Sequence, residues 1–174
     1  MSDTPERYGR TTRYFHWGMA VLFLWQFLKF FDRIDEGEHW VGQTLVPWHI
    51  SVGTLLLVLG LYRVYWALKQ RGHRPHVHGM LASLATIGHF MLYLVMVLLP
   101  IAGILLMVGN GYGLKAFGMQ LVAKSETEIA WMAGLGELHS PLAWLFLILV
   151  VGHIVAALYH HFVERDDTLT RIWS

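Results

Sequence analysis

The sequence predicts an all-α integral membrane protein, a four-helix bundle with both termini on the cytoplasmic side. Of its 174 residues 55% are hydrophobic, and the mean hydropathy is +0.45, both of which are high for a soluble domain of this size. Four segments are long and apolar enough to cross a bilayer, which takes a helix of about 20 residues. Basic residues are concentrated in the segments that would lie on one side of the membrane.

The four membrane helices are expected at residues 14–31, 48–68, 81–108 and 138–162. The first follows a basic tail, as in a signal peptide, but it lacks a cleavage site of small residues and stays aromatic to its end, so we expect it to remain as an anchor. The loop after the third helix starts with Gly109-Asn110-Gly111-Tyr112-Gly113, which predicts a turn. The connections are too short for a second domain, so residues 1–174 are expected to form one domain.

The distribution of Lys and Arg predicts the orientation of these helices. Nine of the thirteen basic residues lie in the N-terminal tail, in or beside the loop between the second and third helices, and in the C-terminal tail. The other four lie in or next to the loops at 32–47 and 109–137. Because basic residues are enriched on the cytoplasmic side, we expect both termini in the cytoplasm and these two loops on the outer side.

The composition excludes several kinds of site and partner. The chain contains no cysteine, which excludes disulfides, cysteine-ligated iron–sulfur clusters and covalently attached c-type haem. The formal net charge is only +1, so nothing indicates nucleic acid as a partner. Eleven histidines remain as the chemically active residues to explain.

Four of these histidines pair at matching depths. His49 and His139 lie at the outer ends of the second and fourth helices, whereas His16 and His153 lie towards the inner side of the first and fourth. His139 and His153 are 14 residues apart, which is about 21 Å along a helix and close to a whole number of turns, so they share one face. Two levels with two facing imidazoles each suit two b-type haems with bis-histidine ligation.

A purely structural role or a zinc site accounts less well for these histidines. A single histidine in a membrane helix is more often a hydrogen-bonded interior group than a ligand, but four at matched depths are harder to explain in this way. Zinc would need three or four ligands at one height, and here the heights pair in twos. His73, His76 and His78 lie in a segment that predicts a solvated cytoplasmic turn, with a metal site as the alternative.

Small residues and short motifs complete the pattern. Glycines that could make room for a planar macrocycle are Gly18, Gly53, Gly60, Gly103 and Gly152. The motifs are, in chain order, Tyr14-Phe15-His16-Trp17, Trp48-His49-Ile50-Ser51-Val52-Gly53, Gly88-His89, Leu99-Pro100-Ile101-Ala102-Gly103, Ala116-Phe117-Gly118, Leu138-His139, Gly152-His153, His160-His161-Phe162 and Asp167-Thr168-Leu169. Each motif is short, but their order and spacing together are specific.

In these motifs the chain resembles the bacterial cytochrome b561 family over nearly its whole length. The resemblance implies a four-helix dihaem b-type cytochrome of the bacterial inner (plasma) membrane that passes electrons between the two faces of the membrane. It also implies that the haem ligands are His16, His49, His139 and His153, the four residues selected by depth. One branch of the family is similar to a superoxide:ubiquinone oxidoreductase.

Residues near the inner level are candidates for a quinone pocket. His89 enters this level from the third helix, and His160 lies about two turns beyond His153. Histidine can donate hydrogen bonds to quinone carbonyls and supply protons near neutral pH. Arg74, or Arg71, could stabilise negative charge on a partly reduced quinone. Alternatively, the arginines only set the topology, the histidines reach the membrane interface, or these groups bind haem propionates.

A superoxide site would need an exposed haem edge and a positive field. Lys115 and Lys124 in the long outer loop are the candidates for this field, together with Lys29 and Arg33 at the end of the first helix. Four carboxylates stand in residues 32–38, however, and the outer segments hold seven acidic and four basic residues. Such a surface suits a basic protein donor of electrons, or a solvated loop, better than the entry of an anion.

The expected function is electron transfer across the membrane through two haem b groups. A periplasmic one-electron donor, superoxide in the first instance, would be oxidised and ubiquinone reduced, so that the protein is an oxidoreductase of the superoxide:quinone type. The alternative is a membrane-anchor subunit that relays electrons between a partner dehydrogenase or hydrogenase and quinone. Haem storage or sensing predicts no quinone reduction, and a transporter with histidine proton relays predicts a colourless protein.

Overall fold

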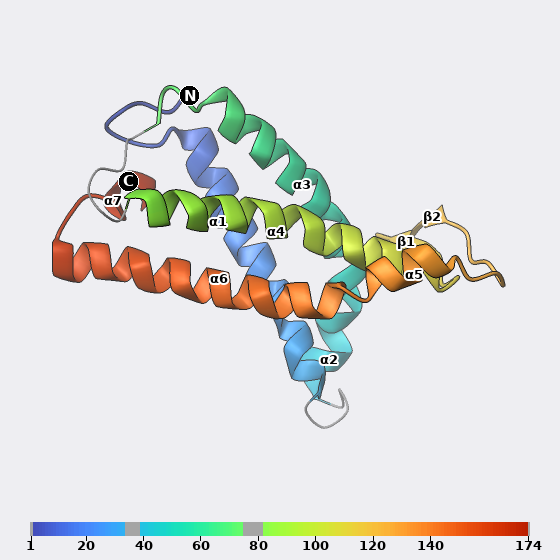
Figure 1. Cartoon of the computed structure of the whole chain (residues 1–174). Helices are drawn as coiled ribbons and strands as arrows, with labels where there is room; N and C mark the ends of the chain where they lie inside the picture. The colour runs from blue at the N-terminus through green and yellow to red at the C-terminus, as the bar shows by residue number, and fades with distance from the viewer. Residues whose placement is uncertain (1, 34–38, 75–81, 174) are drawn as a thin grey trace.

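Four long helices pack together in the computed structural model, which describes residues 2–33, 39–74 and 82–173. They are α1 (Arg10–Phe27), α3 (His49–Lys69), α4 (Ala82–Gly109) and α6 (His139–Tyr159). Figure 1 shows α4 and α6 side by side and running in opposite directions, with α1 crossing behind them. α3 packs against both α1 and α4.

Apolar side chains from all four helices meet in one core. The rings of Phe23 on α1 and Phe146 on α6 have their centres 4.8 Å apart. Leu56 of α3 and Val95 of α4 are each only 1% exposed. The other buried members of this core are Met19, Val52 and Met96. In lipid, close packing of this kind rather than the exclusion of water holds helices together.

Three stretches of the described residues are long and apolar enough to cross a membrane: Trp40–Lys69, Ser83–Gly109 and Ala130–Glu164. Large apolar side chains cover their outer surfaces, as expected for contact with lipid chains; Val58 is 62% exposed and Ile148 66%. α1 is not among the three stretches, and its first turn carries Arg10 and Arg13.

The observed helices correspond closely to the expected segments. α3, α4 and α6 each begin one residue after the predicted start. α1 begins four residues earlier than predicted, at Arg10, and continues into the 3₁₀ turn η1 (Leu28–Arg33). The difference arises because hydropathy marks where the apolar run begins, whereas the helical backbone continues into the basic residues before it.

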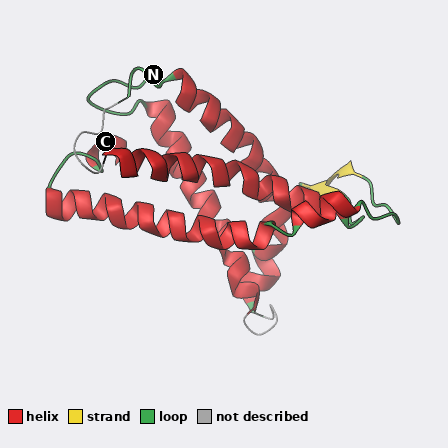
Figure 2. Ribbon diagram, viewed as in Figure 1, coloured by secondary structure: helices red, strands yellow, loops and turns green. Residues whose placement is uncertain are grey.

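The segments beyond the far ends of the helices are folded. α2 (Trp40–Thr44) and the 3₁₀ turn η3 (Val46–Trp48) precede α3, and α5 (Ala130–Gly136) precedes α6. After α4, Gly111 and Gly113 have positive φ angles of 74° and 70°, so the predicted turn is present. It leads into an antiparallel hairpin, β1 (Leu114–Ala116) and β2 (Met119–Val122), which Figure 2 shows as the only strands of the described residues.

Both ends of the described chain lie at the end of the bundle opposite the hairpin (Figure 1). α6 passes into a π-helical turn, η4 (His160–Glu164), and the chain closes with α7 (Thr170–Trp173). Tyr8 donates its backbone N–H to the carbonyl of Arg171 at 3.2 Å, and Trp17 donates its indole N–H to the carbonyl of Ile172 at 3.2 Å. The two ends of the described chain are thus hydrogen-bonded to one another at this end of the bundle.

Candidate functional site

The outer pair of histidines is formed by the first residues of two helices. His49 begins α3 and His139 begins α6, and their ring centres lie 5.9 Å apart. Nδ1 of His139 lies 2.9 Å from the carbonyl oxygen of Leu99 on α4, so Nδ1 carries the hydrogen and donates it. This contact fixes the ring orientation and leaves the lone pair of Nε2 for a metal ligand bond.

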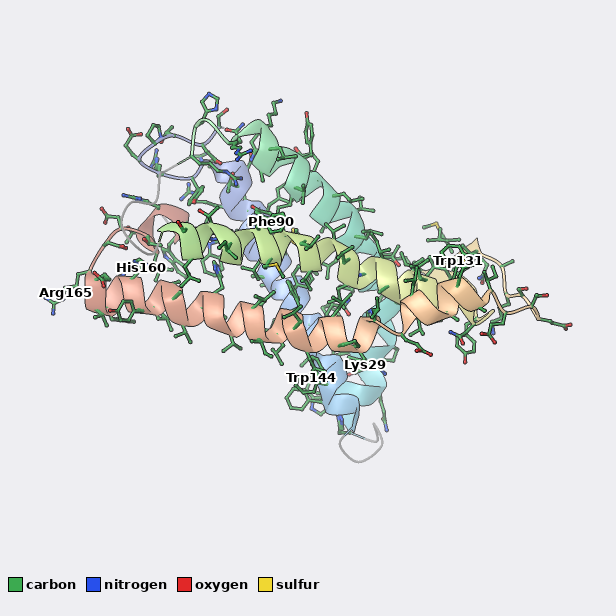
Figure 3. The ribbon with its side chains drawn as sticks, in the orientation of Figure 1. Lys29, Phe90, Trp131, Trp144, His160 and Arg165 are labelled. Atoms are coloured by element: carbon green, nitrogen blue, oxygen red, sulfur yellow. The ribbon has the colours of Figure 1, made fainter. Side chains whose placement is uncertain are left out.

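A cavity of about 400 Å³ adjoins the outer pair. Aromatic and aliphatic side chains of α1, α3, α4 and α6 form most of its wall, with Gln26, Lys29 and Ser140 as polar members. Gly103 makes room for His139, because a Cβ atom there would lie 2.9 Å from both Cε1 and Nδ1 of the imidazole ring. Figure 3 shows Lys29 near Trp144, at the end of α1 towards α2.

The inner pair joins α1 and α6. The ring centres of His16 and His153 lie 6.2 Å apart. His89 of α4 adds a third imidazole, with its ring centre 5.4 Å from that of His153. On the other side Nη2 of Arg63, from α3, lies 3.2 Å from Nδ1 of His16.

The spacing of both pairs fits a planar metal-containing group that is bound by one imidazole on each of its two faces. Metal–nitrogen bonds of about 2 Å, with roughly 1 Å from nitrogen to ring centre, put two such rings about 6 Å apart. The observed separations are 5.9 Å and 6.2 Å. Within the described residues no group of three or more His, Cys, Asp or Glu side chains could hold a bare metal ion, which gives zinc no support. His76 and His78 lie outside the described residues.

The structure therefore brings together the histidines that the sequence pairs by depth. The other inner candidates are placed differently from one another. His89 lies against His153, whereas His160 lies further along, near the end of α6 (Figure 3). No interaction between His89 and His160 is present among the described residues. Nδ1 of His160 is instead 2.7 Å from Oδ2 of Asp166.

Asp166 can hold His160 as a carboxylate. Burial alone would raise the pKa of Asp166, but hydrogen bonds from Thr168 and His160 outweigh it and lower this pKa below its ordinary value. A carboxylate on Nδ1 orients an imidazole and leaves its Nε2 available for proton exchange.

Arg74 belongs to a polar cluster at the inner end of the bundle. Its Nε lies 3.1 Å from Oδ2 of Asp3, whose side chain is fully buried. Oδ1 of Asp3 accepts hydrogen bonds from the backbone N–H of Gly9 at 2.8 Å and from the hydroxyl of Thr12 at 2.6 Å. Through these bonds of Asp3 the N-terminal tail is linked both to α1 and to the chain that follows α3.

Of the two candidate lysines on the outer side, Lys115 lines a groove beside the histidine pair and Lys124 does not. Lys115 of β1 lines an open groove of about 550 Å³ together with Trp48 and Ser51, beside His49. Lys124 is exposed in the chain after β2 and does not line this groove. Of the acidic outer segment, residues 34–38 lie outside the described residues.

Two polar residues of the site were missed by the sequence interpretation. Arg63 is one of the nine basic residues that predict the orientation of the helices, and the sequence does not predict its contact with His16. Gln26 donates its Nε2 hydrogen to the carbonyl of His49 at 3.1 Å, while its buried Oε1 finds no hydrogen-bond partner in the part of the chain that the structure describes. A polar side chain within an apolar membrane helix is itself a signal of a functional position, and this signal could have identified both.

Known proteins resemble this chain over most of its length. The sequence pattern of the family described as prokaryotic cytochrome b561 matches residues 7–174. Cytochrome b561 homolog 2 of Escherichia coli (strain K12) is 34% identical over 98% of this chain and 93% of its own length. The probable superoxide oxidase CybB of Yersinia pestis is 32% identical over 83% of this chain and 96% of its own length.

Cytochrome b561 homolog 1 of Escherichia coli (strain K12) is 26% identical over 95% of this chain and 96% of its own length. The family match covers all four long helices and both histidine pairs. The chain therefore belongs to the prokaryotic cytochrome b561 family, membrane proteins that bind b-type haem and transfer electrons across the membrane.

Proposed function

We propose that this protein transfers single electrons through two b-type haems, from superoxide on the outer side of the bacterial inner membrane to ubiquinone on the inner side. The strongest support is that two pairs of imidazole rings lie at two levels of one bundle. The ring centres are 5.9 Å apart in the His49–His139 pair and 6.2 Å apart in the His16–His153 pair. Haem iron, when bound, supplies the one-electron redox chemistry.

In this proposal His49 and His139 hold the outer haem, and His16 and His153 hold the inner haem. Each pair would supply both protein ligands of its haem, which would leave no place for oxygen on the metal and would restrict the protein to outer-sphere electron transfer. In this proposal α1 is the fourth membrane-spanning helix. Its exposed apolar side chains Val21 and Leu24 are suited to contact with lipid chains. Both termini face the cytoplasm, because nine of the thirteen basic residues lie on their side.

The outer side offers positive charge close to the histidine pair. Lys29 lines the cavity that contains His49 and His139, and Lys115 lines the groove beside His49. These side chains, with Lys124 further out, would concentrate the superoxide anion near the outer level. Two superoxide anions each lose one electron and leave as oxygen. One quinone gains these two electrons and two protons from the inner side and leaves as quinol.

On the inner side, His89 and Arg74 would bind the quinone and His160 would deliver protons to it. His89 lies in contact with His153, where an electron would arrive. His160 is oriented by Asp166 and lies at the end of α6, from which its Nε2 can exchange protons with the cytoplasm. His160 follows His153 by seven residues and contacts Asp166 rather than either histidine of the inner pair in the described residues, so in this proposal it carries protons and is not part of the electron path.

Rapid mixing of the purified, oxidised protein with superoxide, with and without a soluble ubiquinone, tests the proposal. We expect superoxide to reduce the haems on the time scale of rapid mixing, and quinone, when present, to reoxidise them. One quinol should form for every two superoxide anions that the protein oxidises. Haems that dithionite reduces but superoxide does not would reject superoxide as the donor.

That second outcome would favour the membrane-anchor alternative, in which a partner dehydrogenase or hydrogenase delivers the electron. The acidic character of the outer segments is the observation behind this alternative, since they contain seven acidic residues and only four basic ones. Co-purification of a hydrophilic redox partner, and reduction of the haems by that partner, would then establish it.

Replacing His160 by Ala should slow quinol formation by about 100-fold, the lower range for the loss of a general acid or base. Both haems should be retained, because His160 has no described contact with either histidine pair. The measurement is the single-turnover rate of quinol formation when the chemically reduced protein is mixed with quinone. His161→Ala, which alters the neighbouring histidine, is the matched control. Unchanged turnover in the His160 variant would exclude this residue as the proton carrier.

A further inference from the structure

We propose that Arg63 binds a propionate carboxylate of the inner haem. This inference rests on the proposed placement of that haem between His16 and His153. Haem b carries two propionates, which are negatively charged at neutral pH and need hydrogen-bond donors. Arg63 lies on α3 within the membrane-crossing stretch Trp40–Lys69 and contacts the ring of His16 directly. A group coordinated by His16 therefore comes next to this guanidinium.

The guanidinium of Arg63 has too few acceptors around it. Within the described residues its buried Nη1 has no hydrogen-bond partner, and Nη2 contacts the neutral Nδ1 of His16 at 3.2 Å. Tyr93 is a further close group: its ring centre lies 5.9 Å from the guanidinium carbon, and its side chain hydrogen-bonds to Arg63 without supplying a negative charge. A guanidinium has five N–H donors, and a buried cation is costly unless a counter-charge is present.

The local balance of charge also favours a carboxylate at this position. Tyr93 lies against both Arg63 and Arg74, so two guanidinium groups are close to one another. Asp3 is the carboxylate of this cluster, and its two oxygens are engaged by Arg74, Gly9 and Thr12. Among the described residues no carboxylate pairs with Arg63. The cluster can thus accept one further negative group, and that group would lie next to Arg63.

The position of the ring hydrogen on His16 links the arginine to coordination. An arginine can only donate, so Nδ1 of His16 accepts in the contact with Arg63 and the ring hydrogen of neutral His16 is on Nε2. If His16 held the haem through Nε2, this hydrogen would be on Nδ1, which could then no longer accept from Arg63. Haem binding would therefore free Nη2 while a propionate carboxylate became available to the guanidinium. A bidentate arginine–carboxylate pair satisfies both nitrogens.

Redox titration of the purified holoprotein, followed through the spectra of both haems, tests this assignment. Arg63→Gln should lower the reduction potential of the inner haem and leave that of the outer haem unchanged, because a lost positive charge favours the oxidised iron. Arg63→Lys keeps the charge and should stay close to the wild-type potential. Arg10→Gln removes the charge of an exposed arginine near the same end and should shift neither potential.

An unchanged inner potential in Arg63→Gln would overturn the assignment. If Arg63→Gln binds no inner haem, the result for Arg63→Lys tests the assignment instead. An inner haem at the wild-type potential in Arg63→Lys supports binding of the propionate through charge. Absence of the inner haem from Arg63→Lys, or a lowered potential there, overturns the assignment. Failure of the proposed function is a separate result, because it is seen in the unaltered protein, either as fewer than two haems for each chain or as haems that superoxide does not reduce.

Discussion

Replacing His139 by Ala is expected to remove the outer haem and to abolish electron transfer between the two faces of the membrane, while the inner haem keeps its spectrum. The rings of His49 and His139 come from different helices and face one another across 5.9 Å. Loss of either ring leaves the same group with one protein ligand. His153→Ala should give the complementary result, with loss of the inner haem alone. Haem content for each chain and reduced-minus-oxidised spectra measure both outcomes.

The double variant His49→Ala/His139→Ala provides a further test. Because both residues act on one group, it should lose no more haem than either single variant, and the two effects should be strongly non-additive. A variant that combines His139→Ala with His153→Ala should bind no haem at all. If His139→Ala and His153→Ala instead removed the same spectral component, the pairing by depth would be wrong.

The pairing could be predicted because helix geometry converts residue number into height. His139 and His153 are 14 residues apart on one helix, so their heights and their common face follow from the helical repeat. The order of the helices then places His49 at the outer level and His16 at the inner one. Helix spacing cannot give ring separations, which depend on how the helices cross and how each side chain is oriented.

Other parts of the site depend on contacts that no periodicity encodes. Arg63 belongs to a polar cluster that also contains Asp3, a residue of the N-terminal tail, and the fold of this tail could not be derived from hydropathy. The hairpin after α4 has strands of three and four residues, which are too short for an alternating pattern to identify. Its turn places Phe117 and Gly118 at positive φ angles, a requirement that only the glycine reveals in the sequence.

The contact that His160 makes depends on residues outside the helical spacing. An α-helix carries His160 to the face of His153, seven residues earlier, which favoured a shared pocket. In the structure α6 changes to a π-helical turn at His160, and this turn alters the rise and rotation per residue. This turn, with Arg165 in the left-handed conformation after it, brings Asp166 back to His160, whose Nδ1 lies 2.7 Å from the Asp166 carboxylate. The spacing predicts the position of His160 along the helix, whereas its partner depends on how the chain leaves the helix.

Replacing Gly103 by Ala should weaken binding of the outer haem by about 10- to 100-fold, the range seen when the support of a ligating histidine is lost. The new Cβ would lie 2.9 Å from Cε1 and Nδ1 of His139, so the ring must move. Nδ1 is the atom that contacts the carbonyl of Leu99 at 2.9 Å, and this hydrogen bond would break. Haem titration of the purified protein, with the inner haem as internal reference, measures the change.

The helix itself should not suffer from this change, because Ala is more favourable than Gly in a helix by roughly 0.5–1 kcal/mol. Gly88→Ala on the same helix makes the same gain, and no atom of the described residues lies within 4 Å of its new methyl group. The two variants thus differ chiefly in the displacement of His139. Outer-haem binding that is weakened in Gly103→Ala and normal in Gly88→Ala would assign the effect to the orientation of one imidazole. Equal binding in both would mean that His139 takes a different position when haem is bound.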